Sequence, residues 1–173
     1  MKRSDINPMP DFFDRYINQV EDIELMDALV KHSTIESYLS PETIHALDGK
    51  RYAPEKWTIK EILQHIIDTE RILSYRALRF ARTDKTALPG FDENMFTASS
   101  RAEERSIDDL LEEFKALRIA NIYLFKNFKK EMLQQSGICF NRNVSVLALG
   151  FIVVGHCTHH MNVVKERYLP LLT

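Results

Sequence analysis

The chain contains little of what a non-helical fold requires. Only five glycines and six prolines occur among its 173 residues, which argues against a loop-rich β fold. Its two cysteines, Cys139 and Cys157, form no Cys-x-x-Cys element, so we expect reduced thiols and a cytoplasmic location rather than a disulfide framework. The remaining composition, 45% hydrophobic and 28% charged, is typical of one globular domain over residues 1–173.

The chain also has no net positive charge and no long hydrophobic run. Its formal net charge is −2, so there is no broad basic field to bind nucleic acid. The N-terminal stretch MKRSDINPMPDFF has no apolar segment of the kind that a signal peptide needs. The most apolar run, residues 144–154, is far shorter than the roughly 20 residues of a membrane span. We therefore expect no nucleic-acid partner and no membrane partner.

What the chain does contain is apolar residues at helical spacing, in four long stretches. A capping box, Thr58 with Glu61, marks the start of the second stretch, and Pro170 is expected to stop the fourth. No convincing strand pattern is present, so the expected fold is an all-α four-helix bundle with up-and-down or crossover connections. The expected helices cover residues 10–30, 58–82, 106–129 and 145–169, with a short helix near 34–39 and connections at 84–94 and 137–143.

Three histidines share a pattern that is typical of a metal site. His156 and His160 are four residues apart, so they lie on one face of the fourth helix and can both reach an ion at about 2.0–2.1 Å. This helix is apolar on every side in its first half, which places the pair in the interior. His65 lies at the edge of the buried face of the second helix. Alone it could be a core histidine bonded to a protein acceptor, but beside the pair it is predicted to be the third ligand.

The other histidines and Cys157 are predicted to have different roles. His32 and His45 lie in polar or irregular context and are expected at the solvated surface. His159 points about 100° away from His160 on the helix, so it is expected beside the ligands or at an interface rather than on the same ion. Cys157 likewise points about 100° away from His156 on the helix, so it cannot easily share the same ion. It is interpreted as a small buried hydrophobic residue.

Three histidines without a fourth protein ligand leave one coordination position open. Structural zinc sites are usually closed by four protein ligands, whereas an ion with an open position can activate a water molecule or a thiol. This pattern predicts an enzyme. A second hypothesis is a metal-stabilised bundle without catalytic activity that acts through dimerisation or partner binding, because the sequence shows no clear nucleophile or acid–base pair.

Two segments carry a family resemblance. The stretch KWTIKEILQHIIDTERILSYRALRFARTDKTALPGFDENMF and the later GHCTHHMNVVKERYLP resemble the DinB-like superfamily, in particular its YfiT-related branch. The resemblance implies a bundle of up-down-down-up topology, commonly a homodimer, with zinc or nickel on His65, His156 and His160. It also implies a small-molecule substrate and either metal-dependent hydrolysis or transfer to a low-molecular-weight thiol, and it does not identify the substrate or a catalytic residue.

Several charged residues are further candidates near the metal. A row of polar side chains along the second helix is interpreted either as a wall that holds an anionic substrate or as a solvated face with local ion pairs. Asp92 and Glu93 are candidates for a general base, with turn chemistry as the alternative, and Glu70 is a candidate for orienting a ligand histidine. The row consists of Asp68, Arg71, Tyr75, Arg79 and Arg82.

Overall fold

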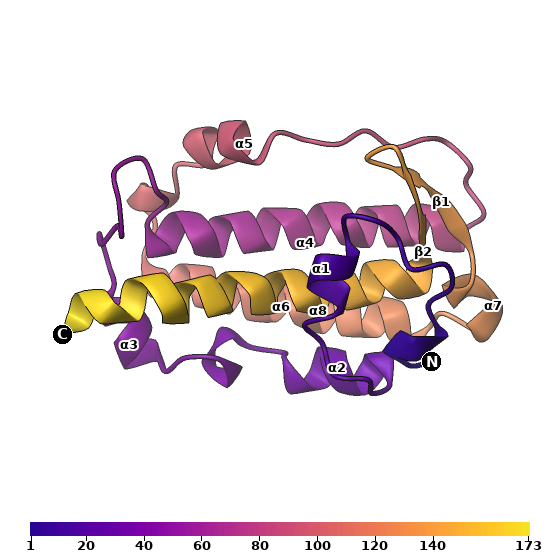
Figure 1. Cartoon of the computed structure of the whole chain (residues 1–173), viewed down its shortest axis with the longest axis horizontal. Helices are drawn as coiled ribbons and strands as arrows, with labels where there is room; N and C mark the ends of the chain where they lie inside the picture. Colours follow the sequence, from indigo (N-terminus) through magenta and orange to yellow (C-terminus); the bar gives the residue numbers. More distant parts are fainter.

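Four helical segments lie side by side along the length of the molecule (Figure 1). The computed structural model describes residues 1–173. The chain runs one way along the first and last of these segments and the opposite way along the two between them. The predicted four-helix bundle with up-down-down-up topology is thereby confirmed. The four segments are α2 (Leu25–Lys31), α4 (Ile59–Ala81), α6 (Ile107–Lys126) and α8 (Val146–Val163).

Helix α4 begins where the capping box predicts. The Thr58 hydroxyl accepts a hydrogen bond from the Glu61 backbone N–H at 3.3 Å, and the Glu61 carboxylate accepts one from the Thr58 N–H at 2.7 Å. Two otherwise unsatisfied donors at the helix start are thus paired. After Ala81 a long connection crosses back over α4, so that α6 starts at the same end of the bundle as α4 (Figure 1).

The prediction of one continuous helix over residues 10–30 is wrong. The segment forms α1 (Asp14–Ile17) and α2, separated by an irregular stretch. The N-terminus occupies the break, because the Leu25 N–H donates to the Met1 carbonyl at 3.0 Å. Close packing also holds α1 in place, since a Cβ atom at Gly155 would meet the Tyr16 carbonyl oxygen at 2.1 Å. The apolar periodicity was real, but these tertiary contacts divide it between two short helices.

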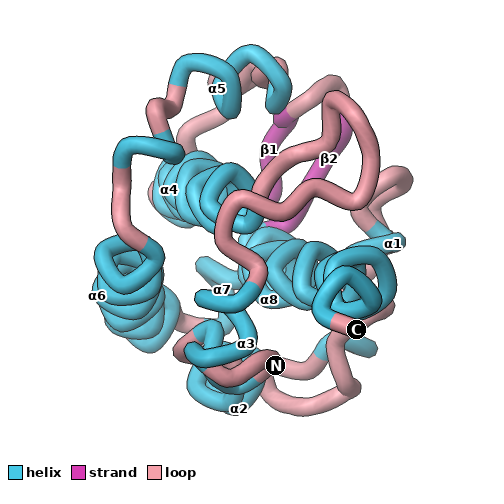
Figure 2. The backbone as a smooth tube through the Cα atoms, turned by 90° about the vertical axis from the view of Figure 1, so that its left-hand side faces the viewer, coloured by secondary structure: helices cyan, strands magenta, loops and turns pink.

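A β-hairpin stands where a plain connection was expected. Strands β1 (Ser136–Cys139) and β2 (Arg142–Ser145) pair antiparallel. The two turn residues, Phe140 and Asn141, have φ values of 50° and 58°, as a tight hairpin turn requires. Strands of four residues are too short for alternation to be detected, and phenylalanine is an uncommon residue at positive φ. The hairpin lies on the same side of the bundle as α5 (Glu93–Ser99), over α4 (Figure 2).

The remaining short elements fill the connections. The short helix expected near 34–39 is a 3₁₀ turn at Ile35–Ser37, and α3 (Pro41–Ala46) follows where no helix was predicted. Helix α7 (Lys130–Leu133) follows α6 in the connection to the hairpin. Beyond α8, a π-helical turn (Val164–Tyr168) and a 3₁₀ turn (Leu169–Leu172) continue the helix past Pro170.

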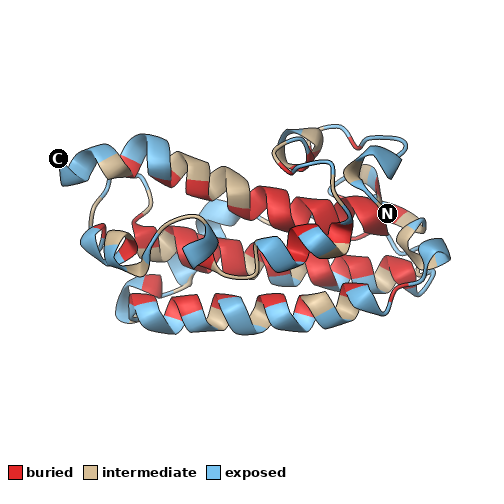
Figure 3. Ribbon diagram, turned by 90° about the horizontal axis from the view of Figure 1, so that it is seen from below, coloured by how far each residue is buried: buried red, intermediate tan, exposed pale blue.

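Helix α8 is the central element of the core. Its first half is buried on every side (Figure 3). By length and composition, residues Val146–Leu172 could cross a membrane, but 72% of the most apolar window is buried inside the bundle. Burial in the core therefore accounts for its apolar character.

A polar layer separates two apolar clusters in the bundle. One cluster of 24 buried residues fills the hairpin end, and another of 16 fills the opposite end. Helices α4, α6 and α8 contribute to both clusters. Where the clusters meet, the same helices bury polar side chains, namely His65, Glu70, Arg118, Asn121 and His156. The candidate site lies in this layer.

Candidate metal centre

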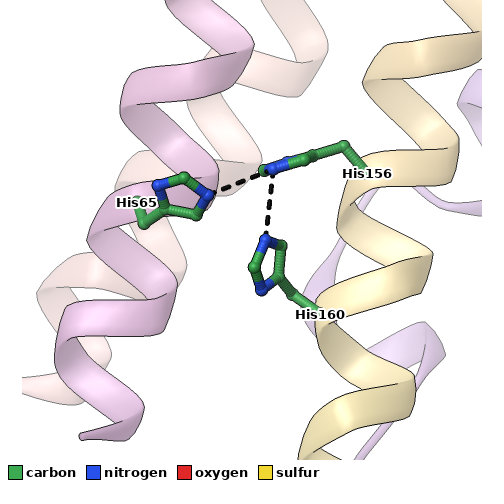
Figure 4. A group of neighbouring side chains, drawn as sticks. All are labelled: His65, His156 and His160. Atoms are coloured by element: carbon green, nitrogen blue, oxygen red, sulfur yellow. Dashed lines mark hydrogen bonds between the residues drawn. The ribbon is translucent and has the colours of Figure 1, made fainter. Parts of the chain in front are cut away.

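The structure brings the three predicted histidines together. His65 comes from α4, and His156 and His160 come from successive turns of α8; all three rings point toward one another (Figure 4). The Nε2 atom of His156 lies 3.1 Å from the Nε2 atoms of both His65 and His160. One ligand atom from each ring lies within 4.8 Å of the other two. The helix-face argument from sequence is consistent with this arrangement.

The spacing of the nitrogens suits one divalent ion. Two nitrogens bound at about 2.05 Å in tetrahedral geometry are about 3.3 Å apart, close to the 3.1 Å that separates the His156 Nε2 atom from those of His65 and His160. The group contains imidazole nitrogens alone, with no carboxylate or thiolate. Such donors suit zinc, nickel, copper and iron. The residues therefore fit a metal, and that the three histidines bind one stays a prediction.

Burial keeps the three imidazoles in the neutral form that can donate a lone pair to an ion. It lowers the pKa of His65 to about 4. Burial first, and the neighbouring imidazoles second, hold the pKa values of His156 and His160 well below the ordinary range. A metal ligand must be deprotonated, so at neutral pH no proton has to be removed before an ion binds.

Aromatic rings hold the three histidines from two sides. The Trp57 ring centroid lies 4.7 Å from that of His65 and 6.3 Å from that of His160. The Tyr16 ring lies 5.3 Å from the ring of His156. These contacts restrict how the imidazoles can turn. Trp57 immediately precedes the capping residue of α4, and Tyr16 belongs to α1, so both segments help to shape the centre.

His159 lies beside the three histidines and not among them, as its helix position predicts. Its Nδ1 atom is 3.3 Å from the Gln19 amide nitrogen, and its ring packs against Tyr16 with centroids 5.3 Å apart. Cys157 is fully buried on another side of α8, and burial raises the pKa of its thiol to about 12. The thiol is therefore protonated and inert, which agrees with its interpretation as a small core residue.

The two histidines expected at the surface differ. His45 is exposed, and its Nε2 atom lies 2.8 Å from the Asp108 carboxylate. His32 is only partly exposed and stacks on Tyr38 with ring centroids 4.9 Å apart. The prediction of a solvated side chain is thus wrong for His32, because the chain folds this ring onto Tyr38.

The structure corrects the role suggested for Glu70. Its carboxylate accepts two hydrogen bonds at 2.8 Å from the Arg118 guanidinium and one at 2.9 Å from the Asn121 amide. Arg118 has no exposed surface and Glu70 is 2% exposed. Glu70 therefore orients no ligand histidine. An arginine on an apolar helix gave no signal that distinguished it from a surface residue, so sequence reasoning missed Arg118.

The polar row of α4 lies on the flank of the helix face that carries His65 and pairs with its own neighbours. Arg71 pairs with Asp68 at 4.0 Å and with Glu113 of α6, while Arg79 pairs with Asp84 and Tyr75. The interpretation as a solvated face with local ion pairs is the one that the structure supports. None of the five residues of this row lines either of the cavities that reach the histidines, so they form no wall of the site.

A cavity of about 70 Å³ reaches the centre from one side, and Glu93 lines it together with His65 and His156. Glu93 is the only acidic residue in this lining. Asp92 instead caps α5, accepting hydrogen bonds from the Asn94 and Met95 N–H groups at 2.9 and 3.0 Å. Of the two candidate bases, Glu93 alone lies in this cavity.

A second cavity, of about 230 Å³, approaches from the other side. It is lined by His160 together with Trp57, Tyr52 and Lys56. Sequence reasoning missed most of the residues that line the two cavities, because they belong to α1, the hairpin tip and the loops before α4 and α5. Only the fold brings these segments to the histidines.

The comparisons with known proteins agree with the fold. The DinB superfamily model matches residues 39–164, so the chain belongs to the DinB superfamily. A solved structure of similar fold is YfiT from Bacillus subtilis, described as a probable metal-dependent hydrolase with an unusual four-helix bundle topology. The two chains are 15% identical with a TM-score of 0.67, over 92% of this chain and 87% of YfiT. No curated protein matches this chain.

Proposed function

We propose that this protein is a divalent-metal-dependent enzyme in which His65, His156 and His160 hold the ion. The observation that carries the proposal is access: two cavities reach a group of three neutral imidazoles that includes no fourth protein ligand. A purely structural site is normally closed by a fourth ligand. We expect zinc or nickel, because both bind imidazole well.

The reaction that we propose is hydrolysis of a small molecule or its transfer to a low-molecular-weight thiol. A divalent ion on three histidines supplies Lewis acidity toward water or a thiol. Glu93, exposed at the mouth of the cavity beside His65 and His156, is the residue that we expect to accept a proton. The second cavity at His160 supports a two-reactant mechanism, because it gives water or a thiol an approach to the centre separate from that of the substrate.

Metal content tests the site. We expect protein purified without an affinity tag to carry close to one equivalent of zinc or nickel, and His65→Ala and His160→Ala to lose it. His45→Ala is the matched control because this histidine is exposed and remote from the centre. Substoichiometric metal that the two ligand variants leave unchanged contradicts the proposal.

Activity of the metal-loaded protein then separates the two reactions. We expect turnover of either p-nitrophenyl acetate with water or 1-chloro-2,4-dinitrobenzene with a small thiol. Glu93→Gln is expected to lower the rate about 10²-fold or more if this carboxylate takes the proton. An unchanged rate in this variant would remove Glu93 from the mechanism and leave the metal site in place.

A metal-stabilised bundle without activity is the second candidate. The observation in its favour is that the histidines link α4 to α8 across the boundary between the two apolar clusters, so an ion there would cross-link the bundle. Metal that raises the melting temperature, with no turnover of either substrate class, supports this function. Homodimerisation and a cytoplasmic location stay predictions, and size-exclusion chromatography tests the first.

A further inference from the structure

The cavity beside His65 and His156 contains a buried cation without an anion. Arg76 is 5% exposed and lines this cavity. Its Nη2 atom donates to the Pro89 carbonyl at 2.7 Å, but no carboxylate lies within ion-pairing distance of it, whereas the other buried arginine, Arg118, is paired with Glu70. A buried charge is costly unless it is paired. Arg76 therefore lacks the partner that its burial calls for.

A second polar group in the same cavity is also unpartnered. Thr69 is 7% exposed, and its hydroxyl oxygen has no hydrogen-bond partner. Valine has nearly the same shape without this unsatisfied atom, so packing alone does not require a threonine. A buried hydroxyl without a partner is destabilising, because it has lost its hydrogen bonds to water and gained none in the protein. Its position suits a ligand that supplies the missing hydrogen bond.

These groups form a line along α4 that begins at the metal centre. His65, Thr69 and Leu73 are successive at four-residue spacing, Arg76 follows three residues later, and all four line the cavity. Residues at these spacings lie on one face of the helix. From His65 to Arg76 the helix axis advances about 16 Å. The line thus has histidine nitrogens at one end, a hydroxyl next, an apolar side chain after it, and a cation at the far end.

The walls of the cavity and its size restrict what fits there. The lining includes the aromatic rings of Phe12, Phe91 and Phe140. The ring centroids of Phe12 and Phe140 lie 5.3 Å apart. The volume of about 70 Å³ has room for roughly five water molecules. A narrow space between aromatic rings favours a small, flat, apolar body.

We propose that this cavity binds a small molecule with an apolar body and one carboxylate, the carboxylate lying against Arg76 and the reacting end facing the three histidines. A planar guanidinium matches a carboxylate through paired hydrogen bonds. Arg76 is the only cationic side chain that lines the cavity, so one carboxylate balances the charge of this guanidinium. The inference deepens the proposed enzyme function and rests on it for the reacting end.

Glu93 is the residue of this protein whose carboxylate could pair with Arg76 in place of a ligand carboxylate. It lines the same cavity, but its side chain is exposed at the mouth and makes no ion pair with Arg76. A ligand carboxylate inside the cavity would approach the guanidinium from a position that Glu93 does not occupy. If Glu93 instead closes onto Arg76 in solution, Glu93→Gln will increase carboxylate binding.

Binding of benzoate and benzamide tests the proposal, because the two probes share a shape and differ in charge. Their affinities are measured by NMR titration on the metal-stripped full chain, so that no ion attracts the carboxylate. We expect wild-type protein to bind benzoate at least tenfold more tightly than benzamide, and Arg76→Gln to abolish this preference. Arg82→Gln is the matched control, because Arg82 is an exposed cation next to the end of the same helix, outside the cavity.

Two further variants keep the test informative if Arg76→Gln does not fold. Arg76→Lys retains the charge but loses the planar fork, so we expect a severalfold loss of benzoate affinity. Thr69→Val is expected to weaken either probe severalfold without lowering the melting temperature. Equal effects of the Arg76 and Arg82 variants, or benzamide binding as tight as that of benzoate, would overturn the proposal.

The test also separates this inference from the proposed function. A benzoate preference that appears only after zinc is added, and that Arg76→Gln leaves intact, means that the ion and not Arg76 holds the carboxylate; this overturns the inference while supporting the metal site. Conversely, an Arg76-dependent preference in a protein that binds no metal upholds the carboxylate site and contradicts the enzyme proposal.

Discussion

Two polar clusters share the middle layer of the bundle and are built in opposite ways. In one, the Glu70 carboxylate receives three hydrogen bonds from Arg118 and Asn121, and all three residues are buried. In the other, the Nε2 atoms of His65 and His160 have the Nε2 atom of His156 as their hydrogen-bonding neighbour. Cavities reach this group from two sides. One cluster is charged, complete and sealed; the other is neutral, incomplete and accessible.

The difference separates a structural role from a functional one. A buried polar network whose members satisfy one another makes the packing specific and has no use for a ligand. A group of nitrogen lone pairs that converge on one point next to a cavity is completed only by an ion or ligand that enters from solution. Both clusters tie α4 to a neighbouring helix, so loss of either should affect the protein, by different amounts and under different conditions.

The largest effect is expected from breaking the sealed cluster. Glu70→Ala leaves the Arg118 guanidinium buried without an anion, which should lower the free energy of unfolding by about 3–5 kcal/mol. Urea unfolding at pH 7 measures this loss, and adding zinc should not restore it. A loss below 1 kcal/mol would show that water reaches Arg118 and that the cluster is not sealed.

Acid should weaken the histidine cluster through its depressed pKa values. An unfolded histidine titrates near 6.5, whereas the pKa of folded His65 is about 4. Between these values only the unfolded chain takes up the proton, so stability is present above about pH 6.5 and is lost as the pH falls toward 4, on the order of 3 kcal/mol for His65. Urea unfolding of the metal-free protein across this range should show a shallower pH dependence in His65→Asn; identical curves would contradict the shift.

A smaller effect is expected from completing the histidine cluster. Zinc at a hundredfold excess over its dissociation constant should stabilise the wild-type protein by about 2.7 kcal/mol. His65→Ala should lose most of this gain, and His45→Ala, at an exposed residue paired with Asp108, should keep it. Thermal unfolding with zinc and with a chelator measures the difference, and an equal gain in all three proteins would indicate non-specific binding.

The elements that could be predicted from sequence are those whose signals are local. The capping box at Thr58 marked the start of α4, and apolar spacing identified the three long helices and the interior position of α8. The pair His156 and His160 shares a helix face whatever the rest of the chain does. The break between α1 and α2 could not be predicted, because contacts with the N-terminus and Gly155 produce it.

The candidate site was predictable in its ligands and not in its surroundings. His65 was placed at the edge of a buried face, which was enough to bring it near the pair on α8. Glu70 was a candidate for orienting a ligand histidine and is instead paired with Arg118, since its position one turn beyond Ile66 turns its carboxylate toward α6. Helical spacing defines a face of α4, but the neighbouring helix determines what that face meets.

Sequence alone determined the helical class, the helix that forms the core and the inward-facing positions of the three histidines, because each follows from periodicity within a helix. Only the tertiary structure decided which polar groups are satisfied and which are left open. Arg118 and Arg76 look alike in the sequence, as arginines within helices. One is paired with Glu70 and the other lines a cavity beside the histidines, because ion pairing and cavity shape depend on contacts between segments far apart in the chain.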